Sequence, residues 1–159
     1  MTYHEKHVGI GQLAIAHAPD HLTCLGLGSC VAVILYDPTA RMGGIVHVLL
    51  PKAPIPCESE EKYADTGVRK LVREMKLWGS RKENLVAKLV GGAHMFPNLN
   101  ISITNIGYEN YRLARAILRD EGIRIIAEDL AGVNGRSAYL DCSTGKVTVK
   151  TAFAPLRVI

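Results

Sequence analysis

Short apolar runs separated by turn residues account for most of the chain, and these runs predict β-strands. Seven of them have the length and composition of strands, and they lie at residues 12–16, 31–36, 44–50, 86–90, 123–129, 137–141 and 146–151. Ser143, Thr144 and Gly145 separate the last two runs and are typical of a hairpin turn. Most of the runs follow one another without an intervening helix, which favours mixed or antiparallel sheets over a doubly wound parallel sheet.

Two longer segments have the periodicity of amphipathic helices. Residues 61–78 place apolar side chains three and four positions apart, and Gly79 follows them as a helix end. Residues 107–121 repeat this pattern, with Asn105 placed to cap the helix and Gly122 placed to end it. We therefore predict an α+β fold, with one domain over residues 1–159, in which mixed or antiparallel sheets pack as a sandwich and helices cover the outer faces.

Composition and charge exclude several classes of protein. Of the 159 residues, 48% are hydrophobic and 21% are charged, which is ordinary for a globular protein and unlike a disordered chain. The net charge of +4 is spread over predicted helix faces and only 6% of the residues are aromatic, so we expect no nucleic-acid partner. No apolar run has the length of a membrane span, so we expect a cytoplasmic protein that is not inserted in a membrane.

The four cysteines suggest reduced thiols. Cys24, Cys30, Cys57 and Cys142 contain no C-x-x-C pair, so neither a zinc ribbon nor a thioredoxin-like site is indicated. Nothing at the N-terminus points to secretion, where disulfides would be expected.

Cys30 lies where a glycine-containing turn meets a predicted strand. The turn reads Gly26-Leu27-Gly28-Ser29, and backbone N–H groups in such a turn can converge on an anion because glycine accepts unusual dihedral angles. A thiol at the end of this turn is a candidate nucleophile beside candidate oxyanion donors. The alternative is a free cysteine that only packs in an apolar core.

His47 lies within the apolar run 44–50. The short connection 37–43 predicts an antiparallel hairpin, which would bring Cys30 close to His47 on the neighbouring strand, at the rim of a cleft. An imidazole in hydrogen-bond reach would lower the pKa of the thiol from ~8.5 and hold a thiolate–imidazolium pair. A histidine satisfied within the core is the alternative. His4, His7, His17, His21 and His94 are expected in loops or near the terminus, at the surface.

A Cys–His site usually includes a third group that orients the imidazole. Asp37 lies in the hairpin connection and is better explained as a turn residue, and Asp65 suits the first turn of a helix without any catalytic role. Thr23, Cys24 and Ser29 are nearer in the sequence, and this assignment stays open. Gly91 and Gly92 follow a predicted strand, where they either form a simple turn or let the backbone approach a ligand.

Several short segments, spread over nearly the whole chain, match the motifs of a known protein family and follow one another in the same order. They are residues 25–33, 47–51, 62–66, 91–96, 105–107, 127–129, 135–137 and 144–147. In these segments the chain resembles the chemotaxis chemoreceptor glutamine deamidases, the CheD family. The first few residues and residues 152–159 fall outside the resemblance.

The resemblance implies a protein-glutamine glutaminase with a cysteine nucleophile and without a metal or organic cofactor. Its substrate would be glutamine side chains in the cytoplasmic helical region of chemoreceptors, and its partner the chemotaxis phosphatase CheC. The nucleophile falls on Cys30 and the histidine on His47. The third catalytic position, a threonine in the family, falls on Cys24, and the nearest threonine is displaced to Thr23. The resemblance also implies a fold like the catalytic domain of cytotoxic necrotizing factor toxins.

Two other hypotheses compete with an enzyme. In one, the same fold serves as a non-catalytic adaptor that binds receptors or CheC, which the cysteine at position 24 would favour. In the other, the chain is a structural protein with core cysteines, which leaves the Gly-Leu-Gly-Ser-Cys turn unexplained.

Overall fold

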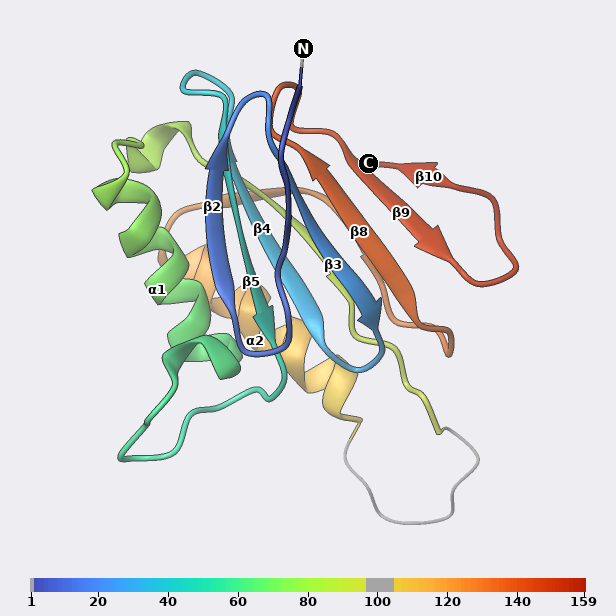
Figure 1. The fold of residues 1–159 in the computed structure, drawn as a ribbon. Coiled ribbons are helices and arrows are strands. Elements are labelled where there is room, and N and C mark those ends of the chain that lie inside the picture. The colour runs from blue at the N-terminus through green and yellow to red at the C-terminus, as the bar shows by residue number, and fades with distance from the viewer. Residues whose placement is uncertain (1, 97–104) are drawn as a thin grey trace.

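Two five-stranded sheets packed face to face, with two helices on the outside of one of them, make up the protein (Figure 1). The structure is a computed structural model that describes residues 2–96 and 105–159. The elements are β1 (Glu5–His7), β2 (Leu13–His17), β3 (His21–Leu27), β4 (Val31–Asp37), β5 (Met42–Val48), α1 (Ala64–Leu77), β6 (Val86–Gly91), α2 (Ile106–Asp120), β7 (Arg124–Leu130), β8 (Arg136–Asp141), β9 (Val147–Thr151) and β10 (Arg157–Val158). Short 3-10 turns precede α1 and β6, at Glu60–Lys62 and Lys82–Asn84.

The two sheets have different strand orders. One sheet runs β1-β3-β8-β9-β10 and the other runs β2-β5-β4-β6-β7. Pairing is antiparallel except for β1 with β3 and β6 with β7, which are parallel. The prediction of an α+β fold with mixed and antiparallel sheets packed together is therefore confirmed.

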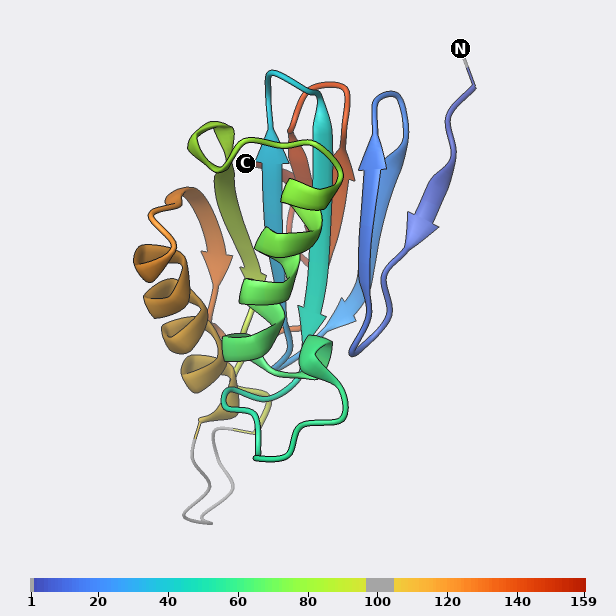
Figure 2. The ribbon, with the colours of Figure 1, turned by 90° about the vertical axis from the view of Figure 1, so that its left-hand side faces the viewer.

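The chain buries two layers of apolar side chains, one on each face of the second sheet. Side chains alternate along β4, so that Val33 and Leu35 pack under the helices while Ala32 and Ile34 face the other sheet. Figure 2 shows α1 and α2 lying on the same face of β2-β5-β4-β6-β7. We call the layer between the two sheets the sandwich core, and the layer under the helices the helix core.

Most of the predicted elements are present, and the departures have physical reasons. All seven predicted strands and both helices occur, and Asn105 caps α2 through its Oδ1, which accepts the N–H of Tyr108 at 3.1 Å. The helices were expected on the outer faces of the sheets. Both in fact cover one sheet, and in the described residues no helix covers the outside of β1-β3-β8-β9-β10.

Three strands were not predicted from the sequence. β1 and β10 are too short to show a pattern, and β3 contains a bulge. Between Cys24 and Leu27 this strand has one residue more than its partner β8, with Gly26 at a φ of 65°. A bulge breaks the period of two that identifies a strand in sequence. His7 and His21, expected in loops or near the terminus, consequently lie in strands, and His17 is the last residue of β2. No helix formed by the described residues is long and apolar enough to cross a bilayer.

Candidate active site

The β4–β5 hairpin places Cys30 and His47 on the same face of one sheet. In the register of this hairpin Ala32 lies opposite His47, and Cys30 precedes β4 by one residue. Side chains two positions apart share a face, so Cys30, Ala32 and His47 all face the sandwich core. Cys30 and His47 are diagonal neighbours across an antiparallel pair, a relation that places Cα atoms about 7–8 Å apart.

Hydrogen bonds from the segment after β6 to carbonyl groups hold the turn before Cys30 in place. The carbonyl of Gly28 accepts the N–H of Ala93 at 2.9 Å, and the carbonyl of Cys30 accepts the N–H of Gly92 at 2.8 Å. Within the described part of the chain, the N–H groups of Ser29 and Cys30 donate to no backbone oxygen. These two donors are therefore available at the thiol, as an oxyanion site requires.

Gly91 and Gly92 are required by the close packing of the turn. A Cβ atom on Gly91 would clash with the carbonyl oxygen of Cys30, and one on Gly92 would clash with the ring of Tyr111. Both glycines have positive φ angles, 116° and 66°, which disfavour other residues. These two glycines therefore let the protein's own backbone and helix α2 pack closely, which takes the place of the close approach to a ligand considered from the sequence.

His47 is oriented by a backbone carbonyl. Its Nδ1 lies 3.1 Å from the carbonyl oxygen of Val8, in the connection between β1 and β2. A carbonyl only accepts, so Nδ1 carries the proton and Nε2 is the unprotonated nitrogen. His47 is 1% exposed, and its Nε2 has no hydrogen-bond partner among the described residues. The imidazole is thus fixed at one nitrogen, and the other is free to act as a base.

Cys24 reaches the same carbonyl from the opposite sheet. It is fully buried on β3, and its Sγ donates to the oxygen of Val8 at 3.4 Å. In the described structure it makes no hydrogen bond to the imidazole itself. The backbone of Thr23 also contributes, because its carbonyl accepts the N–H of Val8 at 2.7 Å. Cys24 is therefore linked to His47 through the shared acceptor, Val8.

Burial acts against charge on both members of the pair. It raises the pKa of the Cys30 thiol, an effect opposed in part by the backbone N–H of Cys30. Burial also lowers the pKa of His47, as does the charge of His7, while the bond to Val8 acts in the opposite direction. Desolvation therefore favours the neutral form of each group, and the thiolate–imidazolium pair stays a prediction.

Alkylation of Cys30 should therefore accelerate only at alkaline pH. We expect the rate of its reaction with iodoacetamide to be low at neutral pH and to keep rising past the pKa of an ordinary thiol, ~8.5, because only the thiolate reacts. Mass mapping of the labelled peptide against pH measures this directly, with half-buried Cys57 as an internal reference. A rate for Cys30 that reaches its plateau near neutral pH would contradict the raised pKa of the thiol.

The carboxylates considered from the sequence lie elsewhere. Asp37 accepts the N–H groups of Thr39 and Ala40 at 2.9 and 3.0 Å, as expected for a turn residue. Asp65 accepts the N–H of Ala53 at 3.0 Å and of Thr66 at 2.8 Å, and orients no imidazole. Within residues 2–96 and 105–159, no group of three or more His, Cys, Asp and Glu side chains is arranged to hold a metal ion.

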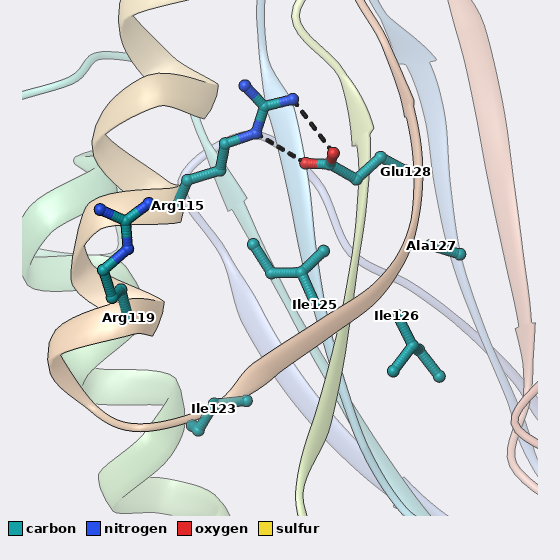
Figure 3. A pocket seen from close by; sticks show the side chains of 7 residues that line it. All are labelled: Arg115, Arg119, Ile123, Ile125, Ile126, Ala127 and Glu128. Carbon is teal, nitrogen blue, oxygen red and sulfur yellow. Dashed lines mark hydrogen bonds and ion pairs between the residues drawn. The ribbon is translucent and has the colours of Figure 1, made fainter.

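One cavity on the protein lies away from the Cys–His pair. It lies between α2 and β7, where Arg115 and Glu128 form a two-bond ion pair beside Ile123 and Ile125 (Figure 3). Three further cavities also exclude Cys30 and His47 from their walls. Cys30 is 6% exposed, and its expected position at the rim of a cleft stays a prediction.

Replacement of Cys24 by threonine should be tolerated. The hydroxyl of threonine finds an acceptor ready in the carbonyl of Val8, so we expect a change in unfolding free energy below ~1 kcal/mol and an unchanged or increased catalytic rate. Cys24→Val, which has nearly the same shape but no donor, is the matched control. Thermal melts and reaction rates of both variants test this. A loss of stability in Cys24→Thr as large as that in Cys24→Val would show that the hydrogen bond to Val8 does not contribute to the unfolding free energy.

Two groups at the site were missed from the sequence. Val8 acts through its backbone carbonyl, a group that every residue has, so the sequence gives no sign of its role. Asn110, fully buried on α2, donates from Nδ2 to the carbonyls of Ser29 and Leu49, each at 3.0 Å. It lies four residues before buried Ala114, so a polar residue on the apolar stripe of this helix was a signal that could have found it.

Fold and site together define an α+β sandwich protein that carries a cysteine and a histidine on neighbouring strands, beside a turn with free N–H groups. A family model described as "CheD chemotactic sensory transduction" matches residues 49–151. The chain belongs to the CheD family. The match begins after Cys30 and His47, but the similarity to individual relatives extends across both residues.

The relatives cover nearly the whole chain. A probable chemoreceptor glutamine deamidase CheD from Desulforamulus reducens is 42% identical over 158 residues, which is 98% of this chain and 95% of the relative. The chemoreceptor glutamine deamidase CheD of Thermotoga maritima is 42% identical over 146 residues, with 92% and 91% of the two chains covered. Among solved structures, the hypothetical protein YfiH of Bacillus licheniformis has a TM-score of 0.50 at 17% identity, over 74% of this chain and 49% of that one, a likeness of fold alone.

Proposed function

We propose that this protein deamidates glutamine side chains of chemoreceptors to glutamate through a thioester on Cys30. The observation that carries the proposal is the fixed tautomer of His47. With Nδ1–H on the carbonyl of Val8, the basic Nε2 lies on the face of the sheet that holds the thiol. Membership of the CheD family supports the same reaction, since the relatives are named for it.

The proposed first half-reaction starts from a neutral thiol and a neutral imidazole, the forms that burial favours. As the sulfur of Cys30 attacks the carboxamide carbon, Nε2 of His47 takes the thiol proton, so a free thiolate never has to accumulate in the buried site. The negative charge that develops on the carboxamide oxygen is stabilised by the N–H groups of Cys30 and Ser29. The imidazolium then gives its proton to the leaving nitrogen, and ammonia departs from the thioester.

The second half-reaction returns the enzyme to its starting state. Neutral His47 takes a proton from a water molecule as the water attacks the thioester carbon, and the same N–H groups hold the second oxyanion. The tetrahedral intermediate breaks at the C–S bond, and the sulfur recovers its proton from the imidazolium. The product carries a carboxylate in place of the carboxamide, and this added negative charge in a receptor helix is what would retune chemotaxis signalling.

The proposal includes where and with what the protein acts. Its substrate is the cytoplasmic helical region of chemoreceptors, and its location is the cytoplasm. The phosphatase CheC is the proposed protein partner. The catalytic groups are Cys30 and His47, and Cys24 supports them through Val8.

The direct test is mass spectrometry of a chemoreceptor. A purified cytoplasmic receptor fragment from the source organism is incubated with the protein, digested, and searched for the mass gain that accompanies replacement of –NH2 by –OH at glutamine. The Thermotoga maritima relative on the same fragment serves as the positive control. Site-specific conversion that depends on the protein supports the enzyme. Binding of the fragment without conversion, where the control converts it, would favour the adaptor.

A further inference from the structure

Asn110 ties the strand that carries His47 to the turn that carries Cys30. Its Nδ2 group has two hydrogens, and each has a separate acceptor. One is the carbonyl of Ser29, next to Cys30, and the other is the carbonyl of Leu49, two residues beyond His47. A single amide from α2 thus bridges the two catalytic segments, and both acceptors require a donor, so the amide nitrogen must face them.

The bond to Ser29 controls the direction of one particular N–H. A trans peptide is planar, with its C=O and N–H pointing in opposite directions. Since Asn110 holds the carbonyl of Ser29 toward α2, the N–H of Cys30 in the same peptide points away from the helix. This N–H lies beside the Sγ of Cys30, where it partly offsets the rise in the pKa of the thiol that burial causes. The carbonyls of Gly28 and Cys30 accept backbone N–H groups, whereas the carbonyl of Ser29 between them accepts from the side chain of Asn110.

The burial of Asn110 is difficult to explain by stability alone. Its Oδ1 is buried and has no hydrogen-bond partner among the described residues, so the side chain carries an uncompensated polar atom. A core residue selected only for packing avoids this cost. An apolar residue of equal size would avoid this cost, but it could not make the two hydrogen bonds of Nδ2.

We propose that Asn110 is a positioning residue that aims the N–H of Cys30 into the oxyanion site and fixes that site relative to His47. The inference rests on the proposed thioester chemistry, but it makes a prediction that needs no receptor. It applies to any acyl transfer to Cys30, because every such step passes through an oxyanion. Alkylation of the same thiol forms no oxyanion and should not depend on Asn110.

The test compares these two reactions on Cys30 in a Cys57→Ser background, which removes the half-buried second thiol. In acylation by p-nitrophenyl acetate, the thiol gains the acetyl group and p-nitrophenol leaves. In alkylation by iodoacetamide, the sulfur displaces iodide. For Asn110→Leu we expect the acylation rate to fall by ~10-fold to ~100-fold, since a misdirected oxyanion donor loses most of its effect. The alkylation rate should stay unchanged when both proteins are compared on the alkaline plateau, where Cys30 is fully ionised and a shift in its pKa no longer affects the rate.

Two further variants separate positioning from stability. Asn110→Ser has a hydroxyl that is one bond too short to reach either carbonyl, so its acylation rate should also fall, and it serves in place of Asn110→Leu if that variant does not fold. Ala114→Gly lies one turn further on the same buried face of α2 and weakens the helix without touching either carbonyl. It should lower the melting temperature and leave both rates unchanged.

The outcomes distinguish this inference from the proposed function. Acylation and alkylation that fall together, or acylation that does not fall, would overturn the positioning role, even if the wild type deamidates receptors. A selective loss of acylation in Asn110→Leu, in a protein whose wild type acylates Cys30 but converts no receptor glutamine, would uphold the positioning role and reject the deamidase.

Discussion

Cys30→Ser is expected to lower deamidation by ~10⁴-fold or more, the scale at which loss of a nucleophile removes chemistry in comparable sites. A hydroxyl is far less acidic than a thiol, and in this buried position the neighbouring imidazole is itself a weak base because burial lowers the pKa of His47. The measurement is the rate of conversion of receptor glutamine by mass spectrometry.

The same variant should keep its fold and its partners. Backbone bonds to the carbonyls of Gly28 and Cys30 hold this segment, and serine has the shape of cysteine with a smaller terminal atom, so we expect a melting temperature and CheC binding close to those of the wild type. Retained turnover in a well-folded serine variant would show that Cys30 is not the nucleophile.

His47→Gln is expected to lower the rate by about 10²-fold to 10⁴-fold, the usual contribution of a general base. Glutamine has a similar size but has no basic nitrogen to take the thiol proton. The test is the same conversion assay. A rate within a few-fold of the wild type in this variant would leave the thiol proton without its proposed acceptor.

The pH dependence of stability provides a second measurement on His47. Because burial lowers the pKa of His47 in the folded protein, the unfolded chain binds the proton more tightly. The contribution of His47 to the unfolding free energy is therefore complete above the ordinary pKa of ~6.5 and is lost as pH falls toward the lowered folded value, by at most ~1.4 kcal/mol per pH unit. In His47→Gln this acid-side slope should be smaller, as denaturant titrations at several pH values would reveal.

The parts of the site that could be predicted depend on local pattern. The hairpin that pairs β4 with β5 was visible because two apolar runs flank a short turn, and its register brings Cys30 and His47 to one face. Asn105 was visible as a cap because capping acts over three residues. Local patterns of this kind survive in the sequence without knowledge of the tertiary fold.

The rest depends on contacts between segments far apart in the chain. Val8 meets His47 because β1 pairs in parallel with β3, and a strand of three residues has no readable period. The raised pKa of Cys30 follows from burial between two sheets, which the residues next to it in the sequence do not indicate. Cys24 was assigned to the third catalytic position by resemblance, and its contact with Val8 rather than the imidazole emerges only from the packing of the sheets.

The use of the Val8 carbonyl to orient His47 has a consequence for how this protein tolerates change. An acceptor that belongs to the main chain survives almost any substitution at position 8, so a saturation library there should show only the effects of packing. Shortening or lengthening residues 8–12 would move the carbonyl itself. The segment should thus accept replacement of residues and reject insertions or deletions, which is the opposite of what is expected of an ordinary loop between strands.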